Sequence, residues 1–78
     1  MLWRKKDMNN EEKIKFIRGL AELNGKIIAL KLEDKDYSKV LEDCKKTAKV
    51  LLHNEVGNFD FSSDEAFEKS MTDFLSDF

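Results

Sequence analysis

The sequence predicts a small all-α domain of three helices, and three observations lead to this prediction. First, apolar residues recur at steps of three and four in three separate segments, as they do on one face of an amphipathic helix. Second, the chain of 78 residues contains no proline. Third, capping residues or glycine flank these segments. A chain of this length is expected to form one domain, residues 1–78, around a small hydrophobic core.

The first helix is expected over residues 10–33, after a flexible basic lead-in at residues 1–8. Asn9 or Asn10 is a suitable N-cap, and with Asn9 as the cap Glu12 follows three residues later, as in a capping box. The apolar face of this helix has residues spaced by 4, 3, 4 and 3 positions: Phe16, Leu20, Leu23, Ile27 and Leu30.

Residues 26–32 also fit a short strand, which would make the fold α/β. Ile28, Leu30 and Leu32 alternate along this segment, and Asn24-Gly25 before it is a tight-turn signal. The helix is favoured because the apolar period continues unbroken through Gly25 and because the chain offers a strand little to pair with. A glycine inside a helix costs about 1 kcal/mol relative to alanine.

The second helix, expected over residues 36–54, is the segment around which the core is organised. Seven apolar residues lie within a band about 120° wide: Tyr37, Val40, Leu41, Cys44, Ala48, Leu51 and Leu52. Asp34 or Asp36 is expected to cap its start, and Gly57 is expected to stop it.

The third helix is expected over residues 63–77. Ser62 and Glu65 have the spacing of a capping box. The helix would then carry Phe67, Met71, Phe74, Leu75 and Phe78 on one face.

Composition and charge restrict the classes of function. The single cysteine allows no internal disulfide, which favours a reducing, cytoplasmic location. The longest apolar run, residues 27–30, is far too short to cross a membrane. Residues 1–53 contain 13 Lys or Arg against 9 Asp or Glu, whereas residues 54–78 contain one Lys against 7 acids. The chain is therefore slightly acidic, at a net charge of -2, and its whole acid excess lies in the C-terminal third, residues 54–78.

Catalytic and metal chemistry find little support in the sequence. One cysteine and one histidine cannot supply the four ligands of a structural zinc site. Cys44 and His53 are nine residues apart on one helix and so point in opposite directions. No calcium-loop, phosphate-loop or nucleophile-elbow motif is present. We therefore expect no enzyme, no cofactor, no metal and no small-molecule substrate.

The C-terminal third is the most unusual part of the sequence, because five of the six Phe of the whole chain fall within the last twenty residues, together with six acids. One interpretation is a third helix that lays its Phe face on the other two. The other is a docking segment whose Phe side chains anchor in a partner while the acids steer it to a basic rim. The candidate contact residues are Phe67, Met71, Phe74, Leu75, Phe78, Asp73, Asp77 and Trp3.

Nucleic-acid binding is the alternative function. Lys39, Lys46, Lys49 and His53 share the outer face of the second helix, and residues 4–6 form a basic arm. Glu42 and Asp43 interrupt this face, and the pI of about 5.4 is far from that of a typical nucleic-acid-binding domain.

The sequence therefore predicts a non-enzymatic protein-binding module rather than a nucleic-acid-associated regulator. Small regulators, inhibitors and accessory proteins of phages or mobile elements share its size and composition, which is an analogy only. The opposite charges of the two ends of the chain also leave a homodimer open.

Overall fold

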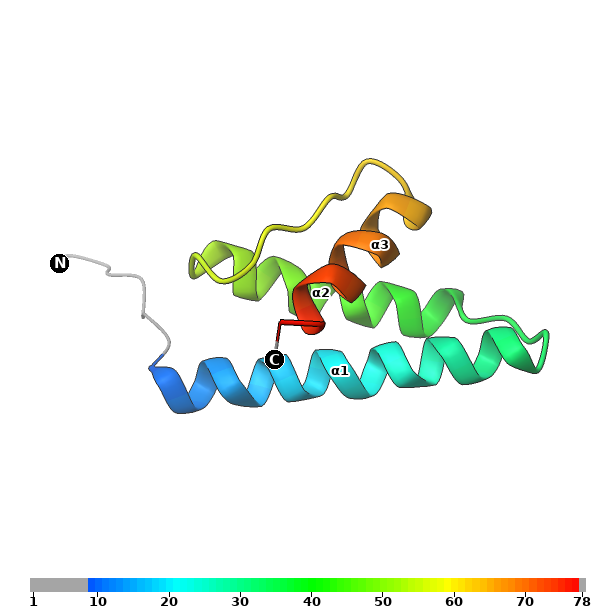
Figure 1. The fold of residues 1–78 in the computed structure, drawn as a ribbon, viewed down its shortest axis with the longest axis horizontal. Helices are drawn as coiled ribbons and strands as arrows, with labels where there is room; N and C mark the ends of the chain where they lie inside the picture. The colour runs from blue at the N-terminus through cyan, green and yellow to red at the C-terminus, as the bar shows by residue number, and fades with distance from the viewer. Residues whose placement is uncertain (1–8, 78) are drawn as a thin grey trace, which may run out of the picture.

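A computed structural model describes residues 9–77. It contains three helices, α1 (Asn10–Leu32), α2 (Ser38–His53) and α3 (Asp64–Leu75), and no strand among those residues (Figure 1). The predicted all-α fold is confirmed. α1 and α2 form an antiparallel hairpin, and α3 lies across both of them. The basic lead-in, Trp3 and Phe78 lie outside the described residues.

α1 begins as predicted and runs without a break through Gly25. The Asn9 side chain accepts a hydrogen bond of 2.8 Å from the Glu12 amide, and Glu12 accepts one of 3.3 Å from the Asn9 amide. Residues 26–32 are helical, so the α/β alternative is wrong. The 3.5-residue apolar period prevails over the local turn signal because it buries Leu20 and Ile27 against the other helices.

α2 begins at Ser38, two residues later than predicted. Its N-cap is Tyr37, which makes no side-chain capping bond. Asp36 lies one residue earlier, and its Oδ1 atom accepts hydrogen bonds from the amide (3.0 Å) and the hydroxyl (2.8 Å) of Ser38. These bonds lower the pKa of Asp36, the backbone bond most strongly. Asp36 therefore satisfies an amide of the first turn without being the N-cap.

α1 and α2 end in the same way, with an acidic residue in the left-handed region. After α2, Glu55 has φ 62°, its amide bonds to the carbonyl of Leu52, and the amide of Val56 bonds to that of Leu51. After α1, Asp34 has φ 59° and an equivalent pair of bonds closes the helix. This is the Schellman arrangement, which glycine usually adopts. The prediction that Gly57 ends α2 is wrong, because Glu55 takes that position.

α3 begins one residue later than its predicted capping box. Ser63 is the N-cap and accepts a 3.1 Å hydrogen bond from the amide of Ala66. Ser62 instead donates its amide to Asp60 at 2.9 Å. The predicted box between Ser62 and Glu65 is therefore wrong, because the turn at Asp60 uses Ser62 before the helix begins.

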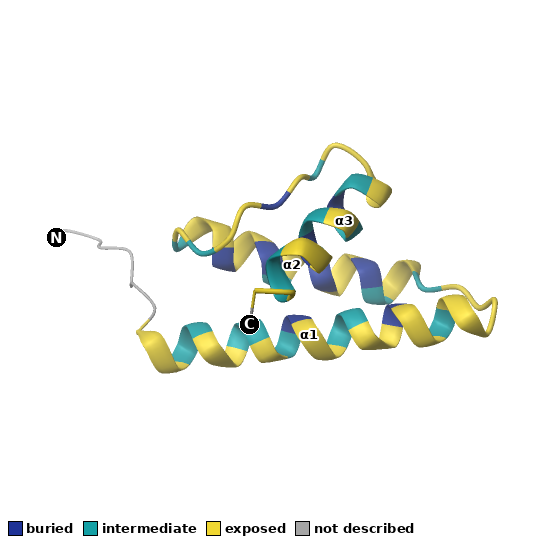
Figure 2. Cartoon of the chain, in the orientation of Figure 1, coloured by how far each residue is buried: buried dark blue, intermediate teal, exposed yellow. Residues whose placement is uncertain are grey.

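The core lies between the hairpin and α3 (Figure 2). It is formed by residues from all three helices and from the connector before α3: Leu20, Ile27, Leu41, Cys44, Ala48, Leu51, Phe59, Phe67 and Met71. Four members of the predicted α2 stripe are among them. Leu52 is not, since its side chain is 39% exposed at the edge of that stripe.

Candidate functional site

The predicted contact residues on α3 separate into a buried and an accessible group. Phe67 and Met71 are fully buried in the core, so their side chains are not available to a partner in this fold. Phe74 and Leu75 are partly buried, and Asp73 and Asp77 are exposed. The candidate surface therefore reduces to the C-terminal end of α3.

The first half of α3 is held to the hairpin by one ion pair on each side. The ammonium nitrogen Nζ of Lys45 in α2 lies 2.6 Å from Oδ1 of Asp64, and the ammonium of Lys31 in α1 forms an ion pair with Glu68. The hydrogen bonds from these two lysines raise the pKa of each, because they favour the charged ammonium form. Neither pair is deeply buried, so they fix position more than they add stability.

Four phenylalanines hold the connector, residues 54–63, against α3. Phe59 meets Phe74 edge to face, with 5.1 Å between ring centroids, and lies 6.2 Å from Phe67. Phe61 stacks on Phe67 at 5.3 Å. The connector thus supplies part of the core, and aromatic contacts of this kind add about 0.5–1.5 kcal/mol each to the burial of the rings.

Gly57 allows the connector to approach these rings. Its φ of 79° is in the left-handed region. A Cβ atom there would lie 2.8 Å from the ring of Phe59 and 3.0 Å from that of Phe74. Only glycine fits this position without movement of the two rings.

Hydrogen bonds hold the rest of the connector in place. The amide of Asp60 donates to the hydroxyl of Ser70 at 3.0 Å, and that hydroxyl donates to the carbonyl of Phe67 at 2.9 Å. Asp60 in turn accepts from Ser62, and the side-chain and backbone hydrogen bonds of Ser62 lower the pKa of Asp60. Ser70 therefore ties the connector to the middle of α3.

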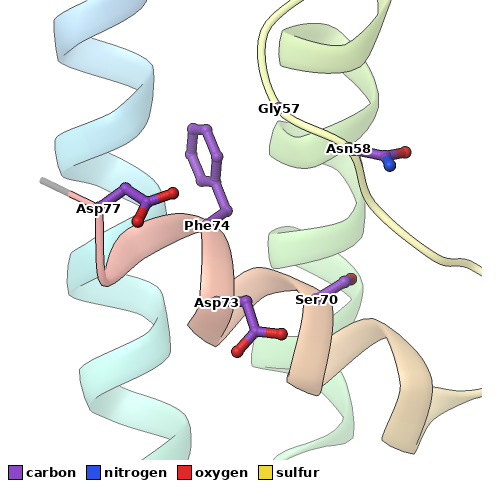
Figure 3. A pocket seen from close by; sticks show the side chains of 6 residues that line it. All are labelled: Gly57, Asn58, Ser70, Asp73, Phe74 and Asp77. Carbon is purple, nitrogen blue, oxygen red and sulfur yellow. The ribbon is translucent and has the colours of Figure 1, made fainter.

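A shallow pocket of about 360 Å³ opens where the connector meets the C-terminal end of α3 (Figure 3). We call it the acidic pocket; it is lined by Gly57, Asn58, Ser70, Asp73, Phe74 and Asp77. Figure 3 shows the ring of Phe74 between Asp77 on one side and the connector residues Gly57 and Asn58 on the other. The pocket thus combines an aromatic surface with two carboxylates.

The two carboxylates of the acidic pocket stand at the unfavourable end of α3. Asp73 lies in its last turn and Asp77 just beyond it, and that turn contains no basic residue. A helix C-terminus carries partial negative charge, so an acid there costs about 0.3–1 kcal/mol at an exposed site. Neither carboxylate forms an ion pair within residues 9–77. No ion pair among residues 9–77 therefore offsets this cost.

The basic face of α2 is exposed, but it is not uniformly basic. Lys39, Lys46, Lys49 and His53 are all exposed, and the ammonium of Lys49 lies 5.6 Å from the centroid of the Phe61 ring. Glu42 is exposed on the same side of the helix. The face therefore presents mixed charge.

Cys44 is a buried apolar side chain, as the sequence predicts. It is fully buried in the core, and this burial raises its pKa to about 11. Such a thiol remains protonated at neutral pH and is a poor nucleophile. Among residues 9–77 no three His, Cys, Asp or Glu side chains are grouped so that they could hold a metal ion. In the same range, no helix is long and apolar enough to cross a membrane.

Sequence reasoning missed the contribution of the connector to this site. Gly57 and Asn58 of the connector, and Ser70 of α3, line the acidic pocket beside the predicted Asp73, Phe74 and Asp77. Gly57 was the signal in the sequence that could have indicated the role of the connector. A glycine that does not end a helix often marks another turn or a close contact of the backbone.

Comparison with known proteins adds no functional information, because the chain matches no protein-family model, no curated protein and no solved structure.

Proposed function

We propose that this protein is a small, cytoplasmic, non-enzymatic binding protein, of the kind that regulates or inhibits a partner protein, and that it binds through the C-terminal end of α3. The observation that supports this proposal is the acidic pocket, where Asp73 and Asp77 flank the partly buried ring of Phe74. The chemistry of the pocket suits an Arg or Lys side chain, which would pair with a carboxylate and stack on the ring.

The energetic position of the carboxylates favours a role outside folding. Asp73 and Asp77 oppose the dipole of α3 and pair with no described side chain. By contrast, Asp64 and Glu68 at the other end of α3 are paired with lysines. Residues that cost stability without a structural return are typical of binding sites.

The test is a charge reversal of the pocket, Asp73→Lys with Asp77→Lys. Removal of the acids from the helix C-terminus should raise the stability of the free protein by up to about 1 kcal/mol. Binding should fall in the same variant, because two attractive carboxylates become repulsive. Opposite effects on stability and binding would separate a binding role from a structural one.

The matched control is Glu42→Lys with Asp43→Lys, which makes the same charge change on the exposed side of α2. Partners from the source cell would be captured on immobilised wild-type protein and on both variants, and affinity would then be measured by calorimetry at two salt concentrations. A partner retained by the control and lost by the pocket variant supports the proposal. Equal retention by all three proteins overturns it.

The same experiment addresses nucleic-acid binding. Retention of the wild-type protein on heparin, if carried by the lysines of α2, should fall steeply with salt. The Glu42 and Asp43 reversals should strengthen such retention, because they complete the basic face. Absence of retention at low salt would remove this alternative.

A further inference from the structure

α1 carries a second apolar stripe that no part of the described chain covers. Ile14, Ile28 and Leu32 are 50, 52 and 84% exposed. Together with the exposed Ala21 and Gly25 they repeat at intervals of 7, 4, 3 and 4 residues, which places them on one side of the helix. The stripe lies on a different side of the helix from the buried core residues Leu20 and Ile27.

The charges beside this stripe alternate in sign, so that two antiparallel copies of α1 would place opposite charges next to each other. Lys15, Glu22, Lys26 and Glu33 follow one edge of the stripe with signs plus, minus, plus, minus. Glu22 and Lys26 lie two residues either side of Asn24. Lys15 and Glu33 lie nine residues either side of it. If a second helix is generated by a 180° rotation about an axis level with Asn24, Glu22 of one copy lies opposite Lys26 of the other. In the same way, Lys15 of one copy lies opposite Glu33 of the other.

We infer that the outer face of α1 binds a second copy of this chain, with the two α1 helices antiparallel and the two-fold axis level with Asn24. In this register Glu22 of each copy lies opposite Lys26 of the other copy, which gives two such pairs. Ile28 of each copy lies against the small side chain of Ala21 of the other. A two-fold interface requires such self-complementarity, because residue i contacts j and j contacts i.

The central charge pairs support this register most directly. Neither Glu22 nor Lys26 forms an ion pair within residues 9–77. Glu33 already lies 2.9 Å from Lys35 of its own chain, so the outer pair with Lys15 must compete with that contact. Arg18 lies level with the neutral residue Leu30 of the second copy.

Gly25 agrees with a close approach of the two helices. A Cβ atom at this position would meet nothing within 4 Å in its own chain, so the fold of one copy does not need a glycine there. Glycine inside a helix is destabilising. In the inferred dimer Gly25 lies next to the two-fold axis, where a small residue lets the backbones come together.

The first test is sedimentation over about 10 µM to about 1 mM, because a contact along a single helix face is narrow and weak. We expect a dimer that dissociates on dilution. Leu32→Glu should raise its dissociation constant at least about tenfold. Val50→Glu, on the exposed side of α2, is the matched control and should leave the constant unchanged.

The charge pairs are tested by a swap. Glu22→Lys alone and Lys26→Glu alone should each weaken the dimer, because like charges then face each other across the axis. The double variant restores opposite charges and should restore the dimer. Thermal unfolding of each variant, at a concentration where it is monomeric, separates this effect from a change within one helix.

The orientation is tested by cross-linking of introduced cysteines. Gly25→Cys should form a disulfide between two copies, because its two positions are separated by about 3 Å along the axis, whereas those of Ile14→Cys are separated by about 30 Å. Cys44 is fully buried and remains as background. A protein that is monomeric at every concentration overturns the inference, as does a dimer unaffected by Leu32→Glu. Equal cross-linking of both cysteine variants also overturns it. None of these outcomes bears on the acidic pocket, which lies on α3.

Discussion

The two halves of α3 contain the same kinds of residue in different surroundings. The first half buries Phe67 and Met71 and pairs Asp64 and Glu68 with lysines of the hairpin. The second half leaves Phe74 partly exposed and its carboxylates unpaired within residues 9–77. The comparison shows that an acidic, Phe-rich helix of only twelve residues can contribute to the core at one end and to the surface at the other. Which end is buried depends on where the helix crosses the hairpin.

The largest expected effect comes from removal of the buried ring. Phe67→Ala should lower the free energy of unfolding by about 3–5 kcal/mol, because it removes a large side chain and leaves a cavity. Phe74→Ala should cost less, since that ring is already partly exposed. Urea denaturation of both variants measures the difference. If Phe67→Ala does not fold, Phe67→Leu supplies a milder comparison. Equal losses at positions 67 and 74 would contradict the division of α3 into two halves.

The next largest effect is expected at Gly57, the glycine that lets the connector approach the ring of Phe74. Gly57→Ala should destabilise the protein by about 2–4 kcal/mol, which combines the cost of a left-handed alanine with the contact on Phe59 and Phe74. Gly25→Ala is the matched control and should stabilise a single copy by about 1 kcal/mol, because it improves a helix interior where space is open. Thermal unfolding at low protein concentration would show shifts of opposite sign; shifts of the same sign would refute this account.

A smaller, stabilising effect is expected at the start of the connector. Glu55→Gly should raise the free energy of unfolding by about 1 kcal/mol, because glycine adopts the left-handed conformation of Glu55 without strain. Asp34→Gly should gain less, since aspartate tolerates that conformation better. Chemical denaturation measures both. A loss of stability in Glu55→Gly would mean that the glutamate side chain makes a contribution that outweighs the strain.

The smallest effect concerns acid. The hydrogen bonds from Ser62 lower the pKa of Asp60 in the folded protein, so their stabilisation is present above the unfolded value of about 3.9 and is lost as the pH falls through the folded value. Asp60→Asn should therefore lose less stability than the wild type between neutral and strongly acidic pH. Urea titrations at both pH values test this, and an unchanged pH dependence would show that Asp60 is not a source of it.

Most of the fold could be predicted because its signals are local. The apolar period of α1 continued through Gly25, and Asn9 with Glu12 marked its first turn. The errors were of one or two residues at helix ends. Ser63 rather than Ser62 is the N-cap of α3, and Glu55 rather than Gly57 takes the left-handed position that closes α2. Such choices depend on which hydrogen bonds the rest of the turn makes.

The candidate site was predicted less completely. Asp73, Phe74 and Asp77 were identified, because acids and aromatic residues alternate with helical spacing near the end of the chain. Phe67 and Met71 share that spacing, and nothing in the periodicity separates the residues that face the hairpin from those that extend past it. Gly57 and Asn58 join the site through the path of the connector.

The sequence by itself determined the number, type and approximate bounds of the helices, because periodicity and capping act over a few residues. It also determined the uneven charge along the chain. Only the tertiary structure decided which end of α3 is buried, since that depends on its crossing of the hairpin and on the ion pairs at Lys31 and Lys45. Likewise, Ile28 and Leu32 could be recognised as exposed only after α2 and α3 had been placed on the other sides of α1.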